Sequence, residues 1–205
     1  MINLGADLTP LDFLTAIVAL YVVVDPIGNV PLFVALTAKL DKTRKRRVLI
    51  LSVLVAASVL VLFATFGIEI FGYFGVRLGD FVIASGLILT AFSLYQLLRP
   101  YEQTISSNGL EVAIVPLAVP FLAGPASISY VLLLSKYMGV FPTLFVIFTV
   151  SVLTLFTLYI SEFILKILGM LGVRVLEKIM LIISVAIGIS LIRRGLQLWS
   201  AELLT

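Results

Sequence analysis

Long apolar stretches alternate along the chain with short polar gaps. A hydrocarbon core about 30 Å thick is crossed by about 20 apolar residues of helix, so each stretch is long enough to span a membrane. The apolar residues show no alternation of period two, which favours helices that satisfy their own backbone groups. Six helical spans are predicted: Leu11–Ala38, Val48–Phe74, Phe81–Leu98, Val112–Leu134, Phe141–Leu165 and Ile179–Leu198.

The composition excludes a soluble protein. Only 12% of the 205 residues are charged and 61% are hydrophobic, with a mean hydropathy of +1.23, whereas a soluble domain has about 25% charged residues. The chain has no cysteine and no histidine, which removes disulfides, thiolate chemistry and imidazole ligands. We therefore predict an all-α polytopic membrane protein with no metal and no cofactor.

The basic residues are distributed unevenly between the two sides of the predicted bundle. Ten Lys and Arg residues fall on one side and four on the other. By the positive-inside rule the richer side is cytoplasmic, which predicts that both termini lie outside. The net charge of +3 is thus explained by orientation and does not indicate nucleic-acid binding. The cluster Lys42–Arg47 either sets this orientation or contacts anionic membrane lipids.

A short motif occurs twice and divides the chain into halves. The residues GYFGVR at 72–77 are echoed by GMLGVR at 169–174, after the second and the fifth span. The interpretation is two copies of three helices, over 1–98 and 112–205 with a linker at 99–111; the alternative is a chance match. Because three is odd, the second copy enters the membrane from the opposite side. This predicts a 3+3 inverted-topology repeat, a design common in secondary transporters.

The first span contains a dense helix-breaking segment at Asp25–Pro31. Pro26 and Pro31 interrupt the hydrogen-bond ladder, and Gly28 supplies the conformational freedom of a turn. Two half-helices are therefore predicted, Leu11–Val24 and Val30–Ala38. Asn29 is expected to cap the second half-helix at its N-terminus.

The fourth span carries a counterpart at Pro116–Ser127. Pro120 breaks the helix, Gly124 is expected at the N-cap and Pro125 at the first helical position. Each half therefore has its break in its own first helix, and paired interruptions of this kind point to a transporter's binding site. The alternative is that the prolines only kink the helices for packing.

Asp25 is a candidate functional group because it lies at mid-depth, where a charge costs about 3 kcal/mol. It is predicted to bind a substrate ammonium or a coupling proton; the alternative is a protonated or turn-capping carboxyl. Helix N-termini at the two breaks offer N–H donors to a carboxylate. The predicted ligand is a small zwitterion, and the candidate substrate-binding residues are Asp25, Gly28, Asn29, Gly124, Ala126 and Ser127. Small residues occur in the third and in the sixth span and would let helices pack closely there: Ala84, Ser85, Gly86, Ala91 and Ser93, and Ser184, Ala186, Gly188 and Ser190.

The segments Asp25–Phe33 and Pro116–Pro125 resemble the two signatures of the MarC-related membrane proteins, also called the small neutral amino acid transporter family. The resemblance extends over the whole chain. It implies a prokaryotic inner-membrane protein that moves glycine, alanine and similar amino acids, driven by a proton gradient. Ala126 and Ser127 depart from the pattern, because many relatives carry a second glycine there.

The sequence thus predicts a secondary transporter that uses alternating access around a midplane site. An enzyme is not predicted, because Asp25 is the only ionisable group expected away from the ends of the spans, with Glu69 and Glu162 near helix ends, and a catalytic site needs several. The first alternative is an uncoupled channel or passive exporter of small solutes. The second is a membrane scaffold with no substrate.

Overall fold

The computed structural model describes residues 9–98 and 117–203, which form helices and turns without a β-strand. The all-α prediction is confirmed for these residues. The elements in chain order are α1 (Pro10–Val24), α2 (Val30–Thr37), α3 (Lys42–Tyr73), α4 (Leu78–Leu98), the short π-helix η1 (Leu117–Leu122), α6 (Pro125–Met138), α7 (Val140–Tyr159) and α8 (Ser161–Leu203). Within this part of the chain, four helices are long and apolar enough to cross a membrane: α3, α4, α7 and Leu171–Ser200 of α8. The predicted linker 99–111, Val112 and Pro116 lie outside the described residues.

Several helix boundaries differ from the prediction. The basic cluster Lys42–Arg47 belongs to the first turns of α3 and is not a loop. The fifth span ends at Tyr159 instead of Leu165, and α8 begins at Ser161. The gap predicted at Lys166–Lys178 is helical, with a sharp bend at Gly169, where φ is +64°. The predicted gap therefore contains a real break, but it is confined to Gly169, and residues 171–178 belong to the long second part of α8.

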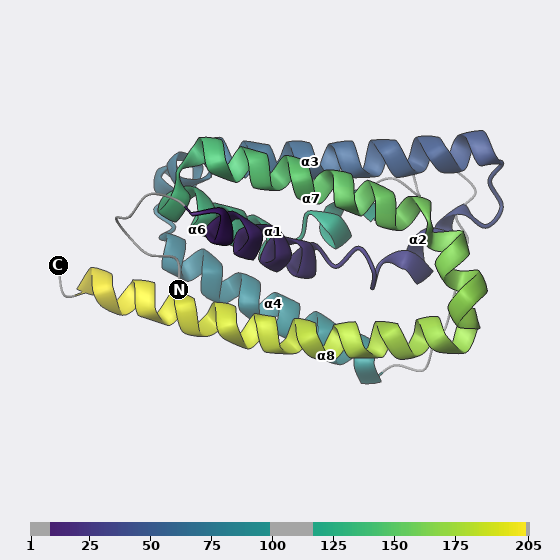
Figure 1. Cartoon of the computed structure of the whole chain (residues 1–205). Coiled ribbons are helices and arrows are strands. Elements are labelled where there is room, and N and C mark those ends of the chain that lie inside the picture. The colour runs from purple at the N-terminus through teal and green to yellow at the C-terminus, as the bar shows by residue number, and fades with distance from the viewer. Residues whose placement is uncertain (1–8, 99–116, 204–205) are drawn as a thin grey trace.

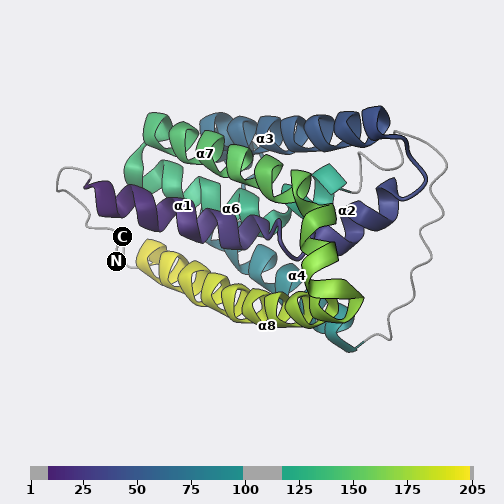
Figure 2. The same ribbon diagram turned by 45° about the vertical axis from the view of Figure 1, so that its right-hand side comes forward.

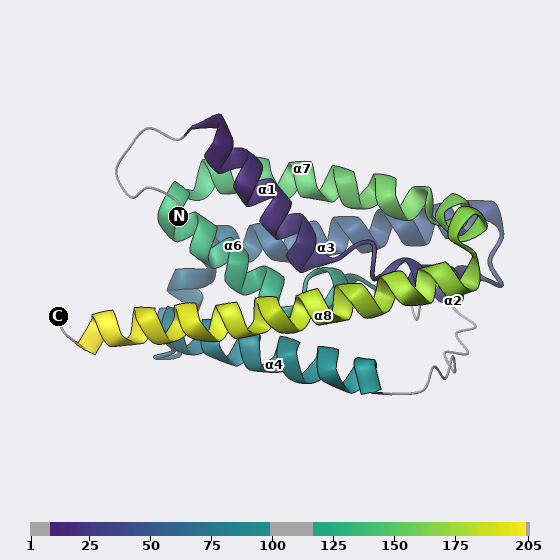
Figure 3. The same cartoon turned by 60° about the horizontal axis from the view of Figure 1, so that its bottom comes forward.

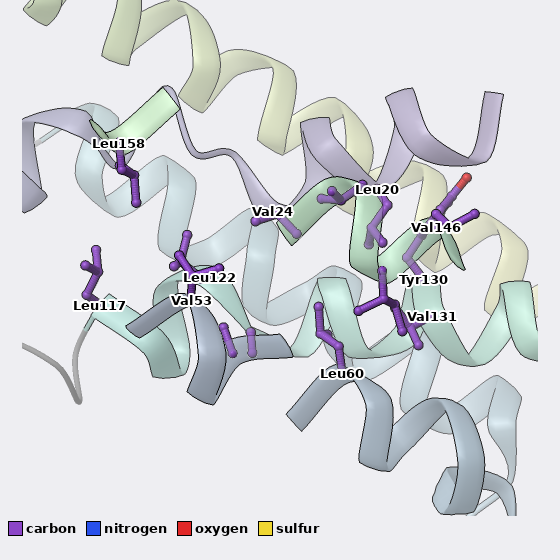
Figure 4. Close-up of a cluster of buried hydrophobic side chains, with 14 of the residues drawn as sticks. Leu20, Val24, Val53, Leu60, Leu117, Leu122, Tyr130, Val131, Val146 and Leu158 are labelled. Carbon is purple, nitrogen blue, oxygen red and sulfur yellow. The ribbon is translucent and has the colours of Figure 1, made fainter. Parts of the chain in front are cut away.

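The helices form two packing groups, which lie side by side in Figures 1 and 3. Helices α1, α3, α6 and α7 pack together with η1, share their core with α2, and form what we call the main body; α2 also contacts α8. Helix α1 lies against α6 and α7 (Figure 2). Helices α4 and α8 pack against each other along most of their length and are called the helix pair. Leu20, Val24, Val53, Leu60, Leu122, Tyr130, Val131, Val146 and Leu158 belong to the core of the main body (Figure 4).

The helix pair is held together through opposed glycines. Gly79 and Gly86 of α4 face Gly195 and Gly188 of α8. A Cβ atom added to Gly86 would lie 2.5 Å from the carbonyl oxygen of Gly188, and one added to Gly195 would lie 2.8 Å from that of Gly79. Real Cβ atoms do not approach backbone this closely, so only glycine permits the observed separation of the two helices. Close packing at the small residues of these two spans is thus confirmed for the glycines, and the structure shows that the two spans pack against each other.

Hydroxyl groups link helices in the apolar interior. Ser129 of α6 donates a hydrogen bond of 2.7 Å to Ser85 of α4, and both residues are buried. The hydroxyls of Tyr21 of α1 and Thr157 of α7 are also 2.7 Å apart. Such bonds join helices where lipid offers no polar partner.

An ion pair joins the start of α3 to the start of α8. The Nζ atom of Lys45 lies 2.7 Å from Oε1 of Glu162, and the hydrogen bond and charge of Lys45 lower the pKa of Glu162, assisted by Lys166 and Lys42. A lowered pKa means that the stabilisation is present at neutral pH and is lost as the pH falls below the ordinary range of a glutamate. The Glu162 side chain is 63% exposed, so we expect a contribution well below about 1 kcal/mol.

Glu162→Gln is therefore expected to lower the melting temperature at pH 7 by no more than about 2 °C. The difference from the wild type should disappear near pH 3, where the wild-type carboxyl is protonated too. Thermal unfolding of both purified proteins at the two pH values checks this. A larger loss at pH 3 than at pH 7 would contradict it.

Candidate functional site

The first break separates α1 from α2 as predicted, since α1 ends at Val24 and α2 begins at Val30. Asp25 follows α1 in a left-handed conformation (φ +48°, ψ +57°), the only residue other than glycine with positive φ in the described chain. Its Oδ1 atom accepts a hydrogen bond of 2.9 Å from the N–H of Gly28. The carboxylate therefore closes the turn through one of its two oxygen atoms.

Asn29 occupies the N-cap position of α2 but does not cap it. Its side chain accepts no hydrogen bond from α2. Instead, its amide donates to the carbonyl oxygens of Asp25 (2.9 Å) and Val24 (3.4 Å). The last carbonyls of a helix lack helical partners, and Asn29 satisfies two of them at the end of α1. The N-cap prediction is correct for the position of Asn29 and wrong for its hydrogen bonds.

The second break lies between η1 and α6. Val119, directly before Pro120, is extended (φ −138°, ψ +120°), which is the effect of a proline on the preceding residue. Helix α6 has Gly124 at its N-cap and Pro125 at its first position, as predicted.

Ser127 joins the two sides of the second break. Its hydroxyl accepts from the N–H of Gly124 (3.2 Å) and donates to the carbonyl of Leu122 (3.1 Å). Ser127 thus acts at the second break as Asn29 does at the first. Among the backbone donors predicted to bind a ligand, the N–H groups of Gly28, Asn29 and Gly124 therefore have partners inside the protein.

A cavity of about 500 Å³ lies between the first break and the helix pair. Its walls come from the segment Val23–Asn29, from α2, α4 and α8, and from Phe121 of η1. Among the predicted site residues, the cavity brings together Asp25, Gly28 and Asn29. Gly124, Ala126 and Ser127 are buried and are not among its described lining residues.

Phe121 brings the second break close to the same cavity. It precedes Leu122, the last residue of η1, and its ring makes a T-shaped contact with that of Phe92 of α4, with the centroids 5.7 Å apart. Both aromatic rings line the cavity. The main body and the helix pair therefore meet at an aromatic contact on the cavity wall.

Polar lining residues from α4 and α8 were not predicted from the sequence. They include Gln96 of α4 and the adjacent charged residues Glu177 and Lys178 of α8. Oε2 of Glu177 is buried without a hydrogen-bond partner in the described part of the chain. The sequence between Lys166 and Lys178 contains no proline. This absence could have indicated that Glu177 and Lys178 lie on a helix and not in a loop.

Two of the charged lining residues are acidic and one is basic, and they come from different elements. Asp25 lies at the end of α1, whereas Glu177 and Lys178 lie on α8. No group of three or more potential metal-ligating side chains occurs within residues 9–98 and 117–203. The arrangement can pair with both charges of a small zwitterion.

The chain is similar to known membrane proteins over nearly its whole length. It is 31% identical to the UPF0056 membrane protein MJ1677 of Methanocaldococcus jannaschii, covering 90% of this chain and 96% of that protein. It is 29% identical to the inner membrane protein YhgN of Escherichia coli, covering 92% and 98%. No solved structure is significantly similar. A profile of the MarC family of integral membrane proteins matches residues 11–200, and the chain therefore belongs to this family.

Proposed function

We propose that the protein is a secondary transporter of small neutral amino acids, of the glycine and alanine class, in a prokaryotic inner membrane. One observation carries the proposal: the first broken helix borders a cavity of about 500 Å³, and Asp25 is one of the residues that line it. The C-terminal end of α1 adds a partial negative charge at this position. A substrate ammonium or a coupling proton would be attracted to both.

The proposal includes a 3+3 inverted repeat over residues 1–98 and 112–205, with both termini outside. In support, a broken helix followed by two long helices occurs twice in the chain, as α1/α2, α3 and α4 and again as η1/α6, α7 and α8. Inverted repeats of this kind let one site face either side of the membrane. Gly124, Ala126 and Ser127 would contact substrate in a state in which the second break opens.

Alternating access would arise from the helix pair rocking against the main body. The cavity lies between these two groups of helices. Gly75, between α3 and α4, and Gly169, at the bend of α8, have positive φ angles of 68° and 64°, and an added Cβ would meet no atom within 4 Å at either. Residues with such open surroundings can absorb changes in backbone angles.

The test is uptake of radiolabelled glycine by the purified protein in lipid vesicles with an imposed proton or sodium gradient. Accumulation above the external concentration that an uncoupler abolishes would support proton-coupled transport. Equilibration without accumulation would favour the uncoupled channel or exporter. Uptake no faster than in protein-free vesicles would contradict the proposal.

Gly28→Ala is expected to impair transport more than folding. A Cβ at Gly28 would lie 2.7 Å from Cγ and 2.9 Å from Oδ1 of Asp25, so the methyl group must displace the carboxylate. A side-chain tip can move at low cost, and we expect the melting temperature to stay within about 3 °C of the wild type. Glycine uptake should fall about tenfold, because small misplacements of a binding group are costly.

Gly72→Ala is the matched control, because a Cβ there would meet no atom within 4 Å. It should leave both uptake and melting temperature close to wild-type values. Equal uptake by the Gly28→Ala and Gly72→Ala proteins would show that the position of the Asp25 carboxylate is unimportant.

A further inference from the structure

Lys178 occupies a defined position on the cavity wall. Its Nζ atom donates to the carbonyl oxygens of Gln96 (2.9 Å) and Leu97 (3.0 Å), near the end of α4 at Leu98. These carbonyls belong to the last turn, where backbone acceptors have no helical partner and the helix dipole is negative. Two bonds therefore fix the ammonium group beside the cavity.

The ammonium group has donor capacity left for a ligand. Lysine carries three N–H donors, and its contacts with described residues use two of them. Lys178 is also the single basic side chain among the described residues that line the cavity. Among the described residues of the cavity wall, Lys178 therefore provides the positive charge that a ligand can contact.

The carboxylate of a zwitterion needs such a cation here. Asp25 and Glu177 both line the cavity, and their charges repel a second carboxylate. The expected backbone donors of the first break are already used, because the N–H of Gly28 bonds to the Asp25 side chain and that of Asn29 bonds to the Asp25 carbonyl. A ligand carboxylate must therefore bind a donor at another position on the cavity wall.

We infer that Lys178 binds the carboxylate of the substrate, in the cavity that Asp25 also lines and where Asp25 would bind the ammonium group. This inference rests on the proposed function and makes it more specific. Lys178 would give the protein its preference for amino acids over amines and amides of the same size. The hydrogen bonds to α4 fix the Lys178 ammonium group before the ligand binds. Little side-chain entropy of Lys178 is therefore lost on binding.

The test compares binding of glycine and glycinamide, which share an ammonium group but not a carboxylate. Dissociation constants are measured by ligand-induced thermal stabilisation of the purified proteins. We expect the wild type to bind glycine about 30-fold more tightly than glycinamide, the effect of one hydrogen bond to a charged group. In Lys178→Met the glycine affinity should fall about 30-fold while that of glycinamide stays within about threefold, and Lys178→Arg should retain most of the preference.

The matched control is Lys136→Met, which removes an exposed lysine from the last turn of α6 and should leave the preference unchanged. If Lys178 only stabilised the end of α4, Lys178→Met would lower the affinities for glycine and glycinamide equally. That result would overturn the inference. An unchanged preference in Lys178→Met would overturn the inference alone, while wild-type glycine transport would still support the proposed function. A wild type that binds and transports no glycine would overturn both.

Discussion

Gly86→Ala is expected to lower the melting temperature by about 6–12 °C, which corresponds to about 3 kcal/mol for a chain of this length. The added methyl would lie 2.5 Å from the Gly188 carbonyl oxygen and 2.9 Å from the Ile192 backbone nitrogen. Backbone of a neighbouring helix cannot turn away as a side chain can. Helices α4 and α8 must therefore move apart, and packing contacts along their interface are lost.

The measurement is thermal unfolding of the purified proteins in one detergent. Gly72→Ala serves as the control here too, because it adds the same methyl near the end of α3, where no atom lies within 4 Å. We expect its melting temperature to match the wild type or exceed it slightly, because alanine favours the helix. If Gly86→Ala unfolded within about 2 °C of Gly72→Ala, the glycine contact would not determine the spacing of α4 and α8.

Asp25→Asn is expected to reduce glycine uptake about 100-fold while leaving the fold intact, because removing one partner of a desolvated charge pair costs about 2–5 kcal/mol. Asparagine tolerates the left-handed conformation observed at Asp25. Its side-chain oxygen can still accept the hydrogen bond from Gly28. The substitution therefore removes the charge and keeps the turn.

Asp25→Ala removes the charge and the turn-closing hydrogen bond together, and it should lose both transport and stability. Initial uptake rates and melting temperatures, measured between pH 5 and pH 8, separate the two effects. Glu162→Gln is the control because it neutralises an exposed carboxylate in the ion pair with Lys45, and its uptake should equal that of the wild type. Wild-type uptake by well-folded Asp25→Asn protein at every pH would exclude both the ammonium and the proton role.

The two helix breaks were predictable because their causes are local. Pro26, Pro31 and Pro125 act on the backbone of their immediate neighbours. The ends of α1 and α2 and the start of α6 accordingly follow the prediction closely. Propensity rules also place Gly124 and Asn29 at N-caps, but they do not foresee that Asn29 bonds backwards to α1.

The opposite wall of the cavity could not be derived in the same way. Glu177 and Lys178 matter because α8 packs against α4 and lies across from the first break, which is a long-range relationship. In sequence they resemble the charges that end a span, and the pattern predicts a loop at these positions. Their position depends on the glycine contacts between two helices about 100 residues apart, and these contacts set which residues face inward.

Asp25 lies between half-helices of unequal length, and in the proposed transporter this would shift it from the midplane position expected from the sequence towards the end of α2. At 1.5 Å per residue, the 15 residues of α1 extend about 22 Å on one side and the eight residues of α2 about 12 Å on the other. A cation arriving from the α2 side would thus cross about one third of the electric field. At about 2.3 kcal/mol per charge for each 100 mV, the membrane voltage would change its occupancy by about 0.8 kcal/mol, roughly a fourfold effect that tracks the resting potential of the cell.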